Sequence, residues 1–543
     1  MGYVNKKSAG IKEKAHMNFM SGPSYELTPL TALRVAASSC FFGEPMYYHR
    51  DKTDKRPRRT GFGSRSRDSQ RYLSDSSVVR LTKCLEAISP TEWRSKTPAE
   101  LLEYAIDKAL DFDAEATLKF AVELRNEYYI RVTPQVILVK AAMHDKVKGT
   151  GWIRKYAKDI IKRADEPATV VAYYISKHGS KKNFPVALKR ALKDTLEGYK
   201  DYHLAKYRME NRVVKTVDAV RISHATSDSI SKLMKGELKL KEDTWESIIS
   251  LEGSTKEAWT KAVDKMGHMA LLRNIRNLVK AGVSEKVWLQ KLIDGSETGM
   301  QLPFRYFSAY NANSDAPASV QDAIETCLEK SLKNLPYFKG KVMSLVDNSG
   351  STGGTPISSM SGVKVNQIGN LMGVLTSKVS DDGYVGVFGD RLEVKTIRKK
   401  SSVFDSHKEV NQLGKTIGGG TEHGIWLFWD KAIKEKQHWD NVFVYSDMQA
   451  GHGGLYGDGV PDKWQTGERY GDYIDVPKLI SEYRNKVNKD VNVFLVQIAG
   501  YQDTIIPEFF KRTYILGGWS DKILHFAAEM IKLAEVGQEA LSQ

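Results

Sequence analysis

The spacing of apolar residues changes near residue 338, and this change constrains the fold of the 543-residue chain more than any other feature. Between residues 73 and 335, apolar residues recur every three or four positions with Glu and Lys between them, which is the pattern of amphipathic helices. This stretch shows no convincing strand-type alternation. Many successive helices of this kind are typical of an α-solenoid, in which each helix pair buries its apolar face on the next pair.

After residue 338, short apolar runs alternate with helical patterns. The predicted strands are 342–346, 384–388, 441–446, 491–498 and 513–516, and the predicted helices are 364–378, 422–436, 478–487 and 521–532. Such alternation predicts a largely parallel, doubly wound sheet with helices on both faces. We therefore predict a multidomain chain, with an all-α helical-repeat module followed by an α/β domain. The predicted parts are a flexible tail (1–20), the helical module (21–338) and the α/β domain (339–543).

The net charge of +15 is unevenly distributed. The first 340 residues contain 58 Lys and Arg against 41 Asp and Glu, whereas the remaining residues contain 23 against 25. A basic excess confined to one module is the electrostatic footprint of a polyanion-binding protein, although a merely soluble basic surface is the alternative. Segment 50–71 alone carries nine Lys and Arg, and it could be a phosphate-grasping arm or a solvated linker.

Basic residues also gather around the predicted helix start at Pro185. They are Lys181, Lys182, Lys189, Arg190 and Lys193. Free backbone N–H groups at a helix start favour phosphate, so this cluster is a candidate RNA contact. A solvated helix face explains the same residues equally well.

A second kind of site is predicted where two strands of the α/β domain end. Asp347, Ser349 and Ser351 directly follow one predicted strand, Thr421 follows a run of glycines before a helix, and Asp447 ends a later strand. Ligands of open α/β sheets bind at such strand ends. Carboxylate and hydroxyl oxygens suit a hard divalent cation, so we predict a Mg²⁺ site formed by these five residues. No general base is evident beside them, which favours a docking site rather than an enzyme.

Three cysteines, far apart and odd in number, predict no disulfide framework and a reducing compartment, with the cytoplasm as the default. No apolar run of 18 residues occurs, and the first 20 residues are polar and basic. We therefore expect neither a membrane span nor a secretory signal.

The predicted metal ligands, in their strand–helix–strand context, resemble the metal-ion-dependent adhesion site of von Willebrand A domains. The likeness extends from Lys339 to the C-terminus. It implies a bound Mg²⁺ that accepts an acidic group from outside. The glycine-rich and aromatic segment 451–471 is not part of the family pattern, and we expect it to overhang the site.

The helical part resembles the TROVE module of the Ro family. The likeness lies in 265–278, in 303–310 and in the run from Lys206 to Arg208 followed by 217–224. Leu271, Leu272, Ile275 and Leu278 should be core, and Arg273 should pair with a carboxylate inside the solenoid. Lys206 and Arg208 join the candidate RNA-binding residues.

The resemblance to the Ro autoantigen and its bacterial relatives implies a ring of HEAT-like repeats whose ends are joined by the A domain. It implies binding of Y RNA on a basic surface and of single-stranded 3′ ends of misfolded RNA, in quality control or decay of noncoding RNA. An exoribonuclease is an implied partner, and we expect a monomer. The insertions 50–71 and 451–471 depart from the family, and 211–215 lacks a histidine used by some animal members.

Two other functions stay open on the sequence alone. In the first, the A domain captures an acidic partner protein and the helices act as a spacer in an adhesion or scaffold protein. In the second, which is the least favoured, the metal site belongs to a nuclease, although hydrolysis with two metals needs more carboxylates than the motif offers.

Overall fold

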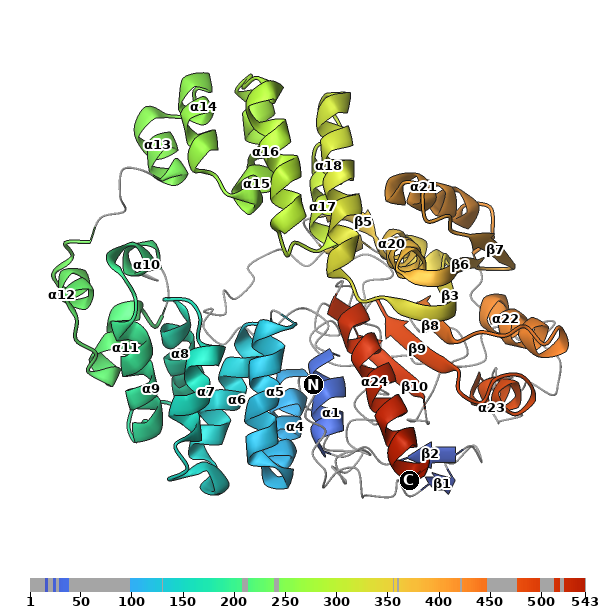
Figure 1. Ribbon diagram of the computed structural model, residues 1–543, viewed down its shortest axis with the longest axis horizontal. Coiled ribbons are helices and arrows are strands. Elements are labelled where there is room, and N and C mark those ends of the chain that lie inside the picture. The colour runs from blue at the N-terminus through green and yellow to red at the C-terminus, as the bar shows by residue number, and fades with distance from the viewer. Residues whose placement is uncertain are drawn as a thin grey trace, which may run out of the picture. The chain divides into compact units, whose positions relative to one another are not determined.

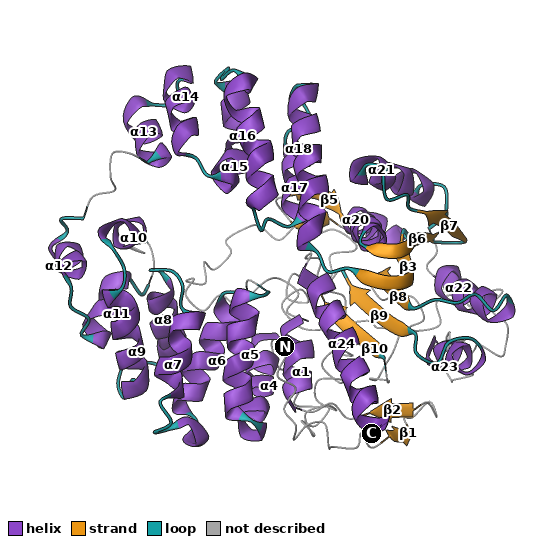
Figure 2. Ribbon diagram, viewed as in Figure 1, coloured by secondary structure: helices purple, strands orange, loops and turns teal. Residues whose placement is uncertain are grey.

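The structure, a computed structural model, describes residues 15–17, 23–25, 29–38, 98–128, 130–207, 213–238, 244–354, 356–358, 361–419, 422–446, 476–498, 512–517 and 522–542. They form two compact units, one containing residues 29–38 and 98–251 and the other containing residues 252 onward together with β1 and β2. Helices precede the sheet along the chain, as Figures 1 and 2 show. The predictions about segments 50–71 and 451–471 lie outside the described residues.

The first unit is helical. Its elements are α1 (Pro29–Ser38), α4 (Pro98–Phe112), α5 (Ala114–Asn126), α6 (Val132–Met143), the 3-10 turn η2 (Asp145–Val147), α7 (Trp152–Ile160), α8 (Glu166–His178), α9 (Val186–Glu197), α10 (Asp201–Lys206), α11 (Thr216–Ser223), α12 (Asp228–Lys235) and α13 (Trp245–Glu252).

The second unit combines helices with a sheet. Its elements are β1 (Ala15–Met17), β2 (Pro23–Tyr25), α14 (Lys256–Lys265), α15 (His268–Lys280), α16 (Glu285–Thr298), α17 (Pro303–Ala312), α18 (Ala318–Ser331), η3 (Leu332–Asn334), β3 (Phe338–Asp347), α19 (Gly350–Gly354), β4 (Pro356–Ser358), β5 (Ser361–Lys364), α20 (Val365–Lys378), β6 (Ser380–Phe388), β7 (Leu392–Thr396), α21 (Val403–Gly414), α22 (Glu422–Lys434), β8 (Asn441–Ser446), α23 (Val476–Lys486), β9 (Asn492–Gln497), β10 (Thr513–Gly517) and α24 (Lys522–Ser542).

Helices of the first unit pack in the manner of a helical repeat. Helix α5 contacts both α6 and α7, α6 contacts α7 and α8, and α7 contacts α9, so helices two apart along the chain pack on one another. The apolar face of each helix is buried between these neighbours, as Leu118 and Leu124 of α5 and Val136 and Leu138 of α6 show. Asp113 starts α5 by accepting a hydrogen bond from the Ala116 N–H at 2.9 Å. The predicted all-α repeat module is confirmed.

The main sheet of the second unit has the strand order β10-β9-β8-β3-β6-β7. All its neighbours are parallel except β7, which is antiparallel to β6 at the edge. From β3 the chain moves to one side, to β6 and β7, and then crosses to β8 on the other side. The strand order therefore reverses between β3 and β8, which is where α/β sheets bind ligands.

Both faces of this sheet are covered, as the predicted doubly wound fold requires (Figure 1). Met343 and Leu345 of β3 face a core shared with α22 and α23, whereas Val346 faces α20. Helix α20 lies so close to the strand that a Cβ on Gly373 would approach the Val346 Cγ1 to 2.6 Å. The five predicted strands and four predicted helices are present. The sequence prediction missed the edge strand β7 and the whole of α21.

The sheet begins at Phe338, yet the compact units do not divide there. Helices α14–α18 belong to the same unit as the sheet because α21 packs on α17 and α18. Phe404 of α21 stacks on Tyr310 with ring centroids 3.9 Å apart, and the Val403 N–H donates to Glu329 Oε1 at 2.6 Å. At the other end, residues 15–17 of the predicted tail (1–20) pair in an antiparallel ladder with residues 23–25, which the sequence analysis assigns to the helical module.

None of the helices in the described part of the chain is both long enough and apolar enough to span a bilayer.

His407 of α21 is buried against Phe307 of α17, and this residue should make the stability of the protein depend on pH. Burial lowers the pKa of His407 to about 4, although its hydrogen bond to the Gln367 carbonyl opposes the shift. Below about pH 6.5 the unfolded chain binds a proton that the folded chain excludes until about pH 4. We expect the free energy of unfolding to fall by about 3 kcal/mol over that range through this group.

The measurement is urea unfolding at a series of pH values, followed by the fluorescence of the buried Trp429 and Trp439. His407→Gln cannot titrate and should lose this part of the pH dependence. An identical pH profile for the wild type and the variant would contradict the assignment.

Candidate metal site and nucleic-acid interface

Asp347 and Ser446 meet at the point where the strand order reverses. Each is the last residue of its strand, and the register of β3 on β8 pairs Val346 with Tyr445 just before them. Both side chains are completely buried, and the Ser446 hydroxyl donates to Asp347 Oδ2 at 2.5 Å. The other carboxylate oxygen, Oδ1, accepts from the Ser349 N–H at 2.9 Å. The aspartate is thus fixed in one orientation by its own loop and by the neighbouring strand.

The loop that follows Asp347 is tied down as well. The Thr352 hydroxyl donates to the carbonyls of Asp347 at 3.1 Å and Ser349 at 3.0 Å. The Gly350 N–H donates to the Gly419 carbonyl at 2.9 Å, which holds the segment just before position 421 beside this loop. The short helix α19 contains Ser351, whose side chain is outside the described part, as are Thr421 and Asp447.

Of the five predicted metal ligands, the structure therefore describes the side chains of two, Asp347 and Ser349. The structure brings together Asp347 and Ser349 and adds Ser446, which the sequence prediction missed although it directly precedes Asp447. A buried carboxylate and two neighbouring buried serines present only hard oxygen donors. This donor chemistry fits Mg²⁺, which prefers oxygen ligands and keeps several of its waters.

The described RNA-binding candidates lie in the turn after α8, on α9 and at the end of α10, and they separate into two groups. Lys181, Lys182 and Arg190 are exposed at or before the start of α9, and the Tyr174 hydroxyl fixes their turn by donating to the Lys182 carbonyl at 2.9 Å. Within the described part of the chain, neither these three nor the half-buried Lys189 has a carboxylate at ion-pair distance.

The remaining candidates differ. Lys193 lies 3.8 Å from Glu197 on its own helix. Lys206 lies 3.6 Å from Glu246, and its ammonium donates to the Tyr202 hydroxyl at 3.1 Å, which raises the pKa of Lys206. Arg208 is outside the described residues. The cluster around Pro185 is thus accessible to phosphate, whereas Lys206 already has protein partners.

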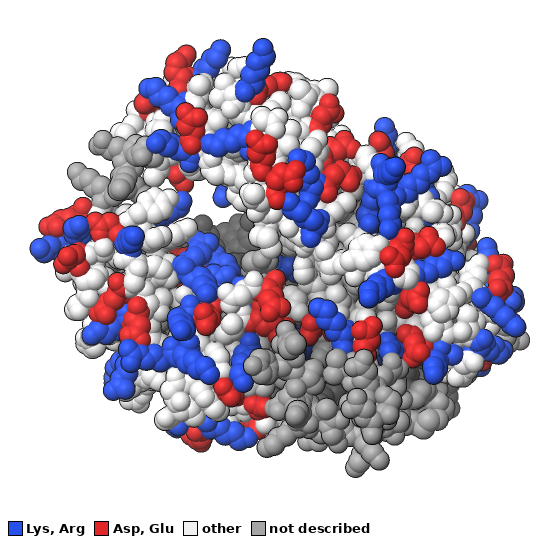
Figure 3. All heavy atoms as spheres, in the orientation of Figure 1, with Lys and Arg blue, Asp and Glu red and all other residues white. Residues whose placement is uncertain are grey.

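Basic residues of α7 extend the cluster on α9, because the two helices pack side by side. Residues 151–200 contain twelve Lys and Arg against five Asp and Glu. Figure 3 shows Lys and Arg gathered over α7 and α9. On α7, Lys158 is exposed, and Arg154 forms an exposed ion pair with Asp194 of α9. This surface, named the α7–α9 basic face, comprises Lys158, Lys181, Lys182, Lys189 and Arg190.

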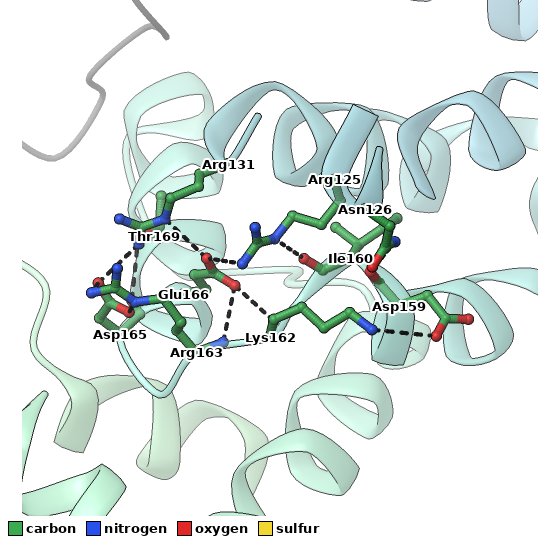
Figure 4. Close-up of polar contacts among 10 residues, drawn as sticks. All are labelled: Arg125, Asn126, Arg131, Asp159, Ile160, Lys162, Arg163, Asp165, Glu166 and Thr169. Atoms are coloured by element: carbon green, nitrogen blue, oxygen red, sulfur yellow. Dashed lines mark hydrogen bonds and ion pairs between the residues drawn. The ribbon is translucent and has the colours of Figure 1, made fainter. Parts of the chain in front are cut away.

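A second group of arginines, which sequence reasoning missed, surrounds the buried carboxylate of Glu166 (Figure 4). Glu166 Oε1 accepts from Arg125 at 3.0 Å and from Arg131 at 3.1 Å, while Oε2 accepts from the backbone N–H groups of Lys162 and Arg163. Asp165 binds Arg131 and Arg163. Three guanidinium groups thus share two carboxylates.

The geometry of this group combines rigidity with access. Arg125 is about 10% exposed and Glu166 is fully buried, whereas the side chains of Arg131 and Arg163 remain 36% and 38% exposed. The Arg163 guanidinium also lies 4.6 Å from the Tyr207 ring centroid. Arginines held in fixed orientations lose little freedom on meeting a phosphate. The sequence signal that could have predicted this group is the acidic pair 165–166, which closely follows the basic pair 162–163.

The signature helix α15 agrees with the sequence prediction in its core but not at its arginine. Leu271, Leu272, Ile275 and Leu278 are buried, as predicted. Arg273, however, is exposed, and no described carboxylate lies at ion-pair distance from it. The predicted internal ion pair is wrong because the inner face of this helix is filled by the four apolar residues together with Asn274.

Comparison with known families identifies the helical part. Residues 231–343, from α12 to β3, match the model of the TROVE domain. This segment of the chain is similar to the TROVE domain, which supports the predicted resemblance to the Ro/TROVE family. The predicted TROVE likeness in 265–278 and 303–310 falls inside this match and is confirmed.

Relatives and solved structures extend the comparison. Telomerase protein component 1 of Rattus norvegicus and that of Mus musculus are each 30% identical to this chain over 109 residues, which is 19% of this chain and 4% of theirs. The chain thus spans a small part of these relatives. The crystal structure of the Deinococcus radiodurans RO (RSR) protein is similar with a TM-score of 0.61 and 13% identity, over 78% of this chain and 93% of that chain. Identity this low shows a shared fold.

Removal of the buried carboxylate tests the arginine group. Glu166→Ala leaves Arg125 buried without its counter-charge, so we expect a loss of about 3–5 kcal/mol in unfolding free energy. Asp194→Ala, which breaks the exposed pair with Arg154, should change stability little because water screens that pair. Urea unfolding followed by circular dichroism measures both, and equal effects would refute the buried role of Glu166.

Proposed function

We propose that this protein is a non-catalytic RNA-binding protein of the Ro type, which binds Y RNA-like small noncoding RNA and the single-stranded 3′ ends of misfolded RNA. The role would be in quality control or decay of noncoding RNA, in the cytoplasm, as a monomer that works with an exoribonuclease. The match of residues 231–343 to the TROVE domain supports this class of function. The single observation that carries the RNA assignment is the α7–α9 basic face.

The charge of that face argues for a polyanion. Its residues are exposed or half-exposed, and none has a carboxylate at ion-pair distance within the described residues. A basic group that is not neutralised by the protein binds phosphate and releases the counterions condensed on the nucleic acid, which favours binding. Exposed Lys and Arg on adjacent helices can follow successive phosphates without reading bases. The surface therefore suits a structured RNA bound through its backbone.

We further propose that Asp347 and Ser349, with Ser351, Thr421 and Asp447, hold Mg²⁺. The cation would supply an electrophilic point for an acidic group from outside. The protein's own contribution is orientation, since Ser446 and the Ser349 N–H fix the carboxylate of Asp347. In this proposal the α/β domain binds a carboxylate or phosphate and does not cleave it.

A metal-dependent scaffold is the second candidate, and the burial and fixed orientation of Asp347 favour it. In that case the α/β domain captures an acidic partner and the helices do not bind RNA. The ratio of absorbance at 260 and 280 nm of protein purified from its own cell separates the two. A ratio typical of clean protein supports the scaffold, and copurified RNA, once sequenced, identifies the ligand.

Binding to a structured small RNA should weaken steeply with salt. Neutralising the α7–α9 basic face by alanine at Lys189 and Arg190 removes two phosphate contacts, so the slope of log affinity against log salt should fall by about 2. The control is Lys256→Ala with Lys286→Ala, which removes the same charge from exposed positions of α14 and α16. Filter binding between low and moderate salt measures both slopes.

The basic-face proposal fails if the two double variants lose affinity equally, because the effect would then follow net charge alone. Salt-independent binding by the wild type would contradict the electrostatic account altogether.

Asp347→Asn should abolish Mg²⁺ binding and leave most RNA binding intact, because the amide keeps the shape of the carboxylate but not its charge. Isothermal titration calorimetry with Mg²⁺ and filter binding of RNA measure the two properties separately. The exposed Asp315, changed to Asn, is the control. Loss of both properties in Asp347→Asn would show that the α/β domain itself contributes to RNA binding, and RNA cleavage that disappears in this variant would revive the nuclease alternative.

A further inference from the structure

A continuous chain of buried and half-buried amide side chains starts inside the loop 347–352, which follows β3 and is named the cation loop. Asn348, which lies between Asp347 and Ser349, exchanges two hydrogen bonds of 2.9 Å with Asn370 of α20. Asn370 also donates to Asn411 Oδ1 at 2.7 Å. Asn348 is 6% exposed and Asn370 is fully buried, so water does not compete for these bonds. The loop that carries the predicted ligands is therefore bonded through α20 to α21.

The chain continues through a neutral histidine. The Asn411 amide donates to His407 Nδ1 at 3.2 Å, and the His407 Nε2–H donates to the Gln367 carbonyl at 2.9 Å. The imidazole then meets the Phe307 ring of α17 edge to face, with centroids 5.0 Å apart. Four side chains thus link the cation loop to the helical module without a gap.

Helix α21 has no room to absorb a shift at either end. Its last residue, Gly414, lies so close to Asn348 that an added Cβ would clash with the side-chain amide. At its first turn, Phe404 stacks on Tyr310, and the Val403 N–H is bound by Glu329. A helix of 12 residues is about 18 Å long and moves as a rigid body.

We propose that α21 couples the cation loop to α17 and α18, so that cation binding beside Asp347 and the packing of the last TROVE helices on the α/β domain are thermodynamically linked. Asn370, Asn411 and His407 are the positioning residues of this link. The inference rests on the proposed Mg²⁺ site but not on RNA binding.

The physical reason is that every link must be satisfied at once. If cation binding shifts Asn348, either Asn370 follows or two buried amide hydrogen bonds are lost, and each unsatisfied buried group costs about 1–3 kcal/mol. A movement of Asn370 together with Asn348 costs less free energy than the loss of these hydrogen bonds. Asn370 then shifts Asn411, and with it α21. Linkage is reciprocal, so a change at the α17–α21 contact must alter cation affinity by the same factor.

Hydrogen–deuterium exchange with and without saturating Mg²⁺ tests the link in the full chain. In the wild type we expect Mg²⁺ to slow exchange about twofold or more in α19, α20, α21 and also α17, whose amides are far along the chain from the loop. Calorimetry on the same sample shows whether Mg²⁺ binds. Mg²⁺ binding without any response in α17 overturns the coupling alone, whereas no binding overturns both the coupling and the metal site.

Asn411→Leu cuts the chain in the middle and keeps the Asn348–Asn370 pair. We expect Mg²⁺ still to bind and to slow exchange in α19 and α20, but no longer in α17. The control is Gln412→Leu, an exposed amide on the same helix, which should behave as the wild type. An unchanged α17 response in Asn411→Leu overturns the assignment of this path.

A reciprocal variant works from the other end, in case Asn411→Leu does not fold. Phe404→Leu removes the ring stack on Tyr310 and leaves every residue near Asp347 untouched. If the coupling exists, Mg²⁺ affinity measured by calorimetry should change about fivefold or more. Wild-type affinity in a folded Phe404→Leu protein overturns the proposal, and RNA binding, measured separately, reports on the proposed function independently.

Discussion

The parallel pairing of β3 with β8 is the contact on which the rest of the α/β domain depends. These strands are separated by almost a hundred residues, and their pairing places Asp347 and Ser446 at one sheet edge where the strand order reverses. Because both strands are buried on both faces, the carboxylate is withdrawn from water and must be held by hydrogen bonds. The cation loop, α19 and the adjacent glycine segment are then arranged around it.

The first unit holds its charged residues in two different ways. Around Glu166, three arginines and two carboxylates neutralise one another almost completely, which stiffens the helices and leaves the outer edges of Arg131 and Arg163 exposed. On the α7–α9 basic face, by contrast, positive charge has no partner among the described residues. The first arrangement fixes structure, and the second leaves attraction available for an external polyanion.

The aromatic contact between α21 and α17 explains why the helices just before β3 belong to the same compact unit as the sheet. The change in apolar spacing at residue 338 marks where helix gives way to sheet, but Phe404, Tyr310 and Glu329 join the last TROVE helices to the α/β domain in one compact unit. The amide chain from Asn348 to His407 runs through the same contact. The loop after Asp347 and helices α14–α18 are therefore parts of one compact unit.

The sequence alone determined the two kinds of architecture, the core of α15 and the TROVE likeness, because each depends on local periodicity or on consecutive residues. It also predicted that Asp347 and Ser349 lie at the end of a strand, because that position follows directly from their order after an apolar run. The sequence did not reveal α21, the Asn348–Asn370–Asn411 chain or the exposure of Arg273. The amide chain joins residues from different elements, and neutral amides carry no sequence pattern that distinguishes a buried partner from a solvated one. Only the packing of the tertiary structure decides which polar groups meet, because that packing removes the water that would otherwise satisfy each of them separately.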